Sequence, residues 1–172
     1  FSLEGLRSVD EDGVEFRSHI DGSRRRFTPE SVMRIQRNLG ADVIMQFDHV
    51  IPGQSTFSES LDASERSIRW LERCLNEATS HRPQATEQIP AESRVTSHES
   101  RQALFPIVQG GIHAELRKQA ARTINGMSDW QGVAIGGLSV GESKPDMYAM
   151  LDLLHPELPA DRPRYLMGVG FP

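Results

Sequence analysis

Short apolar segments alternate with longer amphipathic ones along most of this chain. Apolar segments that each end in Asp or Gly run over 42–48, 104–111, 133–137 and 164–170. Between them lie patterns with apolar residues three and four positions apart, which predict helices at about 29–39, 58–78, 113–125 and 144–154. Apolar strands that alternate with helices predict a parallel sheet with helices packed on its faces.

Residues 13–28 carry a different pattern. Val14 and Phe16 alternate with polar residues, and Asp21-Gly22 is a strong turn pair. This pattern predicts a β-hairpin that decorates the main sheet as an antiparallel addition. We interpret Arg24–Arg26 as a solvated loop tip, with a local basic patch for nucleic acid as the alternative.

The segment 79–100 interrupts the alternation of strands and helices. It is polar, rich in Ser, Thr and Glu, and contains Pro83 and Pro90. We predict a flexible surface insertion here and no domain boundary. Just before it, Cys74 is the only cysteine and lies within a helical pattern, which favours a packed core thiol over a reactive one.

Composition narrows the class of protein. The chain has 172 residues, of which 37% are apolar and 25% charged, a composition typical of globular proteins. The net charge of −5 argues against binding nucleic acid by bulk electrostatics. No apolar run is long enough to span a membrane, and the start of the chain shows neither an initiator Met nor a signal-peptide pattern, so we expect a cytoplasmic protein.

The recurrence of Asp or Gly at every strand end favours a (β/α) barrel over a doubly wound sheet. In a barrel, functional residues gather at the C-terminal ends of all strands, whereas a doubly wound sheet concentrates them at one switch point. A whole barrel needs about 250 residues. We therefore expect residues 1–172 to form a portion of a (β/α)8 barrel with a β-hairpin decoration.

Four groups at the strand ends could bind one ligand: Asp48, Gln109, the Gly136-Gly137 backbone and Met167. A carboxylate accepts hydrogen bonds, an amide and a backbone N–H donate them, and Met offers an apolar surface to a flat ring. Guanine is complementary, because its N1–H and 2-amino group suit the carboxylate and its O6 suits the donors. Taken singly, three of these groups also have a structural interpretation: Asp48 as an Asx turn or helix cap, Gly136-Gly137 as a tight turn and Met167 as a core side chain.

No metal site is evident in the sequence. The six histidines at 19, 49, 81, 98, 113 and 155 are scattered, and none is spaced from another as zinc ligands are. Gly168-Val169-Gly170 lacks the third glycine of a dinucleotide fingerprint. A barrel enzyme that binds a phosphorylated ligand at these glycines and at Gly136-Gly137 is an alternative from a different class.

Several long motifs together resemble the tRNA-guanine transglycosylase (queuine tRNA-ribosyltransferase) family. They occur in the family's order and lie at 16–23, 47–48, 108–111, 133–142 and 163–170. The resemblance covers the chain except for the insertion. It implies a (β/α)8 barrel with a zinc-binding subdomain, and a pentosyltransferase that replaces guanine at the tRNA wobble position with queuine or a 7-deazaguanine precursor through a covalent tRNA–enzyme intermediate.

The resemblance also implies roles for individual residues. The positions that match substrate-binding residues are Asp48, Gln109, Gly136, Gly137, Leu138 and Met167, with Met167 packing on the purine. The positions that match residues shaping the pocket are Val50 and Glu142. The positions that match the start of an RNA-binding segment are Gly168, Val169, Gly170, Phe171 and Pro172.

The resemblance implies further groups that this chain lacks. The family's proton-accepting Asp matches a position before Phe1, and its nucleophilic Asp and zinc-binding Cys/His set match positions after Pro172. We therefore expect part of the base pocket here, with no catalytic residue and no zinc ligand. The expected partners are tRNA, the base and a second subunit in a homodimer or heterodimer. A non-catalytic, tRNA-binding partner subunit of the same family is the alternative.

Val50 bears on which base is inserted. Family members that use the small aminomethyl precursor usually have Cys at this place, whereas Val resembles the sequences that accept the bulkier queuine. The order here is Asp48-His49-Val50, followed by Gly53 in the same loop. We therefore expect the complete protein to accept queuine or a similarly substituted base.

Overall fold

The computed structural model describes residues 7–80 and 102–170. The strands are β1 (Arg7–Val9), β2 (Val14–Arg17), β3 (Arg24–Phe27), β4 (Val43–Met45), β5 (Ala103–Phe105), β6 (Ile107–Val108), β7 (Val133–Ile135) and β8 (Arg164–Leu166). The helices are α1 (Pro29–Leu39), α2 (Phe57–Ser80), α3 (Ala114–Met127) and α4 (Lys144–Leu154).

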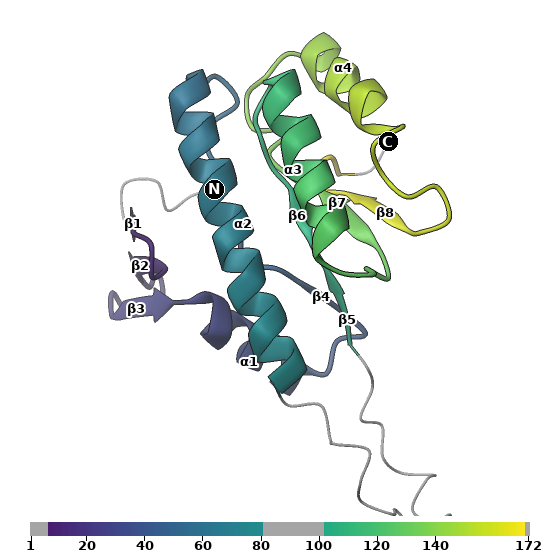
Figure 1. The fold of residues 1–172 in the computed structure, drawn as a ribbon. Helices are drawn as coiled ribbons and strands as arrows, with labels where there is room; N and C mark the ends of the chain where they lie inside the picture. Colours follow the sequence, from purple (N-terminus) through teal and green to yellow (C-terminus); the bar gives the residue numbers. More distant parts are fainter. Residues whose placement is uncertain (1–6, 81–101, 171–172) are drawn as a thin grey trace, which may run out of the picture.

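The strands after α1 are parallel and alternate with helices, as the sequence predicts. β4 pairs with β5, and β6, β7 and β8 form a second parallel sheet in that order. In Figure 1 the helices α2, α3 and α4 lie side by side in chain order, with α3 in front of β6 and β7. The molecule is thus a mixed α/β protein in which α2, α3 and α4 connect successive parallel strands, whereas α1 leads from β3 of the antiparallel sheet to β4.

The predicted single strand at 104–111 is two short strands. Pro106 separates β5 from β6, because proline has no N–H to donate to a neighbouring strand. The side chain of Gln46 bridges the break: its Oε1 accepts from the Ile107 N–H at 2.6 Å, and its Nε2 donates to the Ser67 carbonyl at 3.1 Å. The buried Gln46 amide therefore supplies a hydrogen bond at the break, where no backbone pairing joins the two parallel sheets.

The predicted hairpin is part of a separate sheet. β2 and β3 pair antiparallel as expected, but β1 adds a third strand, and within the described residues no ladder joins this sheet to the parallel strands. The interpretation of Arg24–Arg26 as a loop tip is wrong, because these residues form most of β3. Their charges face acids across the sheet: Arg24 pairs with Glu15 at 3.4 Å and Arg26 with Asp10 at 2.8 Å.

The turn between β1 and β2 fixes this sheet against α2. Arg69 donates two hydrogen bonds to the carboxylate of Glu11, at 2.7 and 2.9 Å. The indole N–H of Trp70 donates to the Glu11 carbonyl at 2.7 Å. Because the Trp70 side chain is fully buried, this bond holds the turn at a fixed point on the helix.

Helix α1 begins and ends where the sequence predicts. The hydroxyl of Thr28 accepts from the Ser31 N–H at 3.2 Å, Pro29 opens the helix, and Gly40 ends it with φ of 71°. The predicted apolar face is only partly buried: Met33 is inaccessible, whereas Leu39 is 76% exposed.

Helix α2 is longer than predicted and ends at Ser80, so the first two residues of the predicted insertion are helical. The rest of that insertion, 81–100, lies outside the described residues. No helix within the described ranges is both long and apolar enough to cross a membrane.

The core lies where α2, α3 and α4 cover the parallel strands, and Cys74 belongs to it. The thiol is fully buried and accepts from the Phe47 N–H at 3.4 Å. Burial raises the pKa of Cys74 to about 12, so the thiol stays protonated at neutral pH. The prediction of a packed core thiol is confirmed.

Candidate functional site

Asp48 and Gln109 meet just beyond the ends of two parallel strands. Asp48 follows β4, Gln109 follows β6, and the Gln109 Nε2 donates to the Asp48 Oδ2 at 2.5 Å. Gln109 is only 3% exposed, and Asp48 is half-buried. Desolvation raises the pKa of Asp48 to about 6, and the Gln109 hydrogen bond opposes this rise. The pair therefore presents a carboxylate that is ionised at neutral pH but poorly hydrated.

Gly136 and Gly137 follow β7 and lie against the Gln109 amide. A Cβ on Gly137 would be 2.2 Å from Gln109 Oε1, and one on Gly136 would be 2.7 Å from Gln109 Nε2. Gly137 also has φ of 61°, a left-handed conformation that glycine adopts without strain. Glycine is therefore needed at both positions because the Gln109 side chain leaves no room for a Cβ. The sequence pattern does not reveal this contact.

Leu138 and Met167 lie at the same edge of the β6–β7–β8 sheet. The Met167 N–H donates to the Ile135 carbonyl at 3.0 Å, which places the end of β8 beside the end of β7. Leu138 is buried and Met167 is half-buried. Gly168, Val169 and Gly170 follow at the exposed surface, whereas Phe171 and Pro172 lie outside the described residues.

An apolar cavity of about 510 Å³ opens beside Asp48. It lies between the N-terminal sheet and the loop after β4, and the residues that line it are Arg7, Val14, Phe16, Phe27, Phe47, Asp48, Val50, Ile51, Pro52 and Val140. Val50 thus faces the same space as Asp48. Apolar walls around a few polar groups are typical of pockets for small molecules.

Glu142 holds the loop after β7 in shape. Its carboxylate accepts from the N–H groups of Ser139 and Val140, the latter at 2.9 Å. The Gly53 N–H donates to the Val140 carbonyl at 3.1 Å, and a Cβ on Gly53 would be 2.7 Å from the Glu142 nitrogen. The loops after β4 and β7 are therefore in direct contact, and Glu142 shapes one of them.

Arg117 is a residue of this site that the sequence interpretation missed. It is on α3, fully buried, and donates to four backbone carbonyls at the ends of β6 and β7. Burial lowers the pKa of its guanidinium to about 10, so the group remains charged at neutral pH. One sequence signal was available: Arg117 is three, four and seven positions from Ala120, Ala121 and Ile124, so it falls on the apolar stripe of its helix.

His49 follows Asp48 and carries no positive charge at neutral pH. Burial, with the nearby charges of Arg66 and Arg7, lowers the pKa of His49 to about 4. Its Nδ1 lies 3.0 Å from Arg66 Nη1, and its backbone N–H donates to the Ser67 hydroxyl at 2.9 Å. These contacts tie the loop that carries Asp48 to α2.

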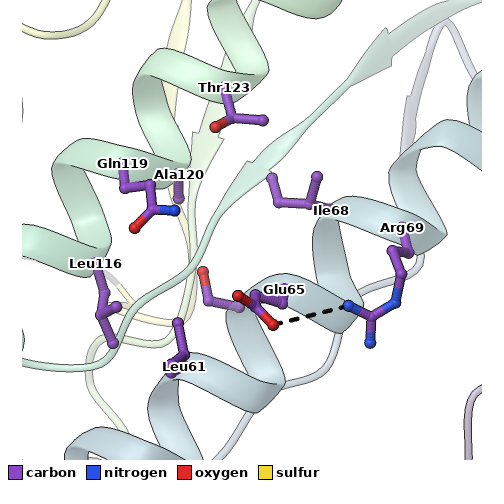
Figure 2. Close-up of a pocket in the computed structure, with 9 residues that line it drawn as sticks. Leu61, Glu65, Ile68, Arg69, Leu116, Gln119, Ala120 and Thr123 are labelled. Carbon is purple, nitrogen blue, oxygen red and sulfur yellow. Dashed lines mark ion pairs between the residues drawn. The ribbon is translucent and has the colours of Figure 1, made fainter.

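A second groove lies between α2 and α3 (Figure 2), and neither Asp48 nor Gln109 lines it. Its volume is about 210 Å³, and Leu61, Ile68 and Leu116 form part of its wall. Glu65 and Arg69, one turn apart on α2, form an ion pair at 4.0 Å along its α2 side. No residue predicted to bind the base lies in it.

Within residues 7–80 and 102–170, no three side chains of the His, Cys, Asp or Glu types lie close enough together to hold a metal ion. These ranges therefore offer no site that fits the zinc ion implied by the family resemblance.

Comparison with known proteins identifies the relatives of this chain. The family model described as queuine tRNA-ribosyltransferase matches residues 1–172. The chain belongs to the queuine tRNA-ribosyltransferase family. Proteins named queuine tRNA-ribosyltransferase from Herpetosiphon aurantiacus, Ruminiclostridium cellulolyticum and Desulforamulus reducens are 49%, 47% and 48% identical to it over 172 residues.

The match covers all of this chain but only part of each queuine tRNA-ribosyltransferase. The chain spans 39% of the length of the relative from H. aurantiacus and 41% of the other two. The family resemblance seen in the sequence motifs is therefore confirmed, for a partial chain.

Proposed function

We propose that the complete protein exchanges guanine at the anticodon wobble position of tRNA for queuine or a related 7-deazaguanine. The observation that carries this proposal is the Asp48–Gln109 pair held against Gly136-Gly137, in a chain that matches the family throughout. The relatives' name describes transfer of queuine to tRNA ribose, which is a pentosyltransferase activity.

The polar groups of the site are complementary to one edge of guanine. The Asp48 carboxylate accepts from N1–H and the 2-amino group. The second N–H of the Gln109 amide, with the Gly137 N–H, donates to O6. Adenine would place its N1 lone pair against the carboxylate, and each buried polar group left unpaired costs about 1–3 kcal/mol. Met167 supplies the apolar surface for the ring, Leu138 belongs to the loop beside the base, and residues 168–172 begin the contact with RNA.

The described residues bind and orient the base and do not break the glycosidic bond. In the proposed reaction a carboxylate supplied by the rest of the protein attacks the anomeric carbon of the ribose, guanine departs, and a covalent tRNA–enzyme intermediate forms. The zinc ion that the family resemblance implies would be held by residues other than those the structure describes. The carboxylate of Asp48 orients the departing and entering bases through the same hydrogen bonds.

We further propose that the two parallel sheets are consecutive parts of a (β/α)8 barrel. Three observations support this: the pairings β4–β5 and β6–β7–β8 are parallel, helices connect the strands, and the ligand-binding groups stand at the C-terminal strand ends. Assembly into a dimer and a cytoplasmic location, where tRNA is found, complete the proposal.

The test is base exchange by the complete protein. We expect purified protein to incorporate labelled guanine into unmodified tRNA and to release it when queuine is added. Binding of guanine and tRNA without exchange would contradict the proposed activity and would fit the non-catalytic partner subunit. Binding that depends on phosphate and ignores guanine would contradict both.

The base preference is predicted separately from the activity. Because Val50 and Val140 line the cavity beside Asp48, a substituent on the base would meet apolar walls there. We expect queuine to compete with guanine for exchange at least as well as the aminomethyl precursor does. Competition assays with both bases measure this preference, and incorporation of the small precursor alone would contradict it.

A further inference from the structure

Arg117 is buried in a place where a charge is costly. Its side chain is inaccessible to solvent, and within the described residues no carboxylate lies at ion-pair distance from it, although the charge of Glu142 acts on it from further away. Moving a guanidinium out of water without such a partner is unfavourable, and an apolar side chain would fill the same core position at lower cost. The carbonyls that surround Arg117 offset this cost.

Four of the five guanidinium N–H groups have carbonyl acceptors. Nε donates to the Gly111 oxygen at 2.7 Å, and Nη1 donates to the Val108 oxygen at 3.2 Å. Nη1 also donates to the Gly136 oxygen at 2.9 Å, and Nη2 donates to the Gly137 oxygen at 3.0 Å. One planar side chain thus joins the loops after β6 and β7.

These bonds determine the direction of two neighbouring N–H groups. In a trans peptide the C=O and the N–H point in opposite directions, and the described residues contain no cis peptide. Because the Gly136 and Gly137 oxygens both face Arg117, the N–H groups of Gly137 and Leu138 point away from it. Because both oxygens accept from one guanidinium, the two peptides face the same way, and successive N–H groups that point to one side form a concave site for an oxygen.

We propose that Arg117 is a positioning residue for base recognition: by holding the Gly136 and Gly137 carbonyls, its guanidinium aims the Gly137 and Leu138 N–H groups together at the exocyclic oxygen O6 of the base. This inference rests on the proposed function and adds to it a second backbone donor and the group that orients both. Arg117 touches no base itself and acts only through the loop after β7.

The test compares two bases that differ only in the exocyclic atom on C6, which is oxygen in guanine and sulfur in 6-thioguanine. 6-Thioguanine keeps the N1–H and the 2-amino group of guanine but carries a sulfur, a weak hydrogen-bond acceptor. In Arg117→Met and Arg117→Lys we expect the KM for guanine to rise about tenfold or more, the inhibition constant of 6-thioguanine to change less than about threefold, and the KM for tRNA to stay the same. Equal losses for the two bases, or no loss, would overturn the proposal.

Arg122→Ala is the matched control. Arg122 lies on the same helix, is exposed, and pairs with Glu157 at 2.8 and 2.9 Å, so its removal is expected to leave all three constants unchanged. Arg117→Ala provides a second test by chemical rescue. Guanidinium added to this variant is expected to restore its affinity for guanine, whereas methylammonium, which lacks the planar set of donors, is not. Recovery of the melting temperature without recovery of guanine affinity would show a purely structural role and overturn the proposal.

The wild-type protein in the same assay separates this inference from the proposed function. Failure of wild type to bind or exchange guanine would overturn the proposed function itself. Normal exchange by wild type, with no difference between guanine and 6-thioguanine in the Arg117 variants, would overturn only the role of Arg117.

Discussion

Replacing Asp48 with Asn is expected to lower guanine exchange by the complete protein about 1,000-fold or more. The Asn amide turns a hydrogen-bond donor toward the N1–H and 2-amino group of the base, whereas the carboxylate accepted from both. A binding site built on such hydrogen bonds loses a large part of its activity when they cannot form. The folded structure should survive, because the Asn side-chain oxygen still accepts from Gln109. Single-turnover exchange of labelled guanine into tRNA measures the effect.

The same variant is expected to be more stable than wild type at neutral pH. The pKa of Asp48 is raised to about 6 by burial, above its ordinary value of 3.8, so the wild-type fold loses stability as pH rises from about 4 to 6. Asn carries no charge and avoids this loss, a gain of about 1–3 kcal/mol at pH 7. Below pH 4, where Asp48 is protonated in both the folded and unfolded states, the gain should disappear.

Denaturation curves of the two proteins between pH 3 and 8 measure this difference. Asp42→Asn is the control, because Asp42 is an exposed carboxylate at the opposite end of β4. It should leave guanine exchange unchanged. A variant at Asp48 that exchanged guanine normally would contradict the assigned role, whatever its stability.

Replacing Gly137 with Ala is expected to lower the affinity for guanine about tenfold or more. A Cβ there would overlap Gln109 Oε1, at 2.2 Å, so the amide must move away from Asp48. The alanine also has to adopt φ of 61°, which adds about 1 kcal/mol of strain. Guanine binding by calorimetry and chemical denaturation report the two effects.

Gly40→Ala separates strain from the overlap. Gly40 has φ of 71°, close to that of Gly137, but a Cβ on it would meet no atom within 4 Å. We expect Gly40→Ala to lose stability through strain alone and to bind guanine as wild type does. If Gly137→Ala lost no more stability and no more affinity than Gly40→Ala, the packing of Gln109 on Gly137 would not matter for the site.

The local elements were predictable because short-range rules determine them. Thr28, Pro29 and Gly40 delimit α1 as the capping and proline rules predict, and the apolar segments became parallel strands. The family was also readable from ordered motifs, since each motif is a run of neighbouring residues. The break at Pro106 and the third strand β1 were missed, because strand pairing depends on partners far away in the chain.

The sequence by itself determined the alternation of strands and helices, the residues at the strand ends and the family. Only the tertiary structure decided how those residues act on one another. Gln109 meets Asp48 across 61 residues, and Arg117 holds the Gly136 and Gly137 carbonyls from a helix that, taken alone, shows only an arginine on its apolar side. Hydrogen bonds between distant segments depend on distance and direction in space, which spacing along a chain does not encode.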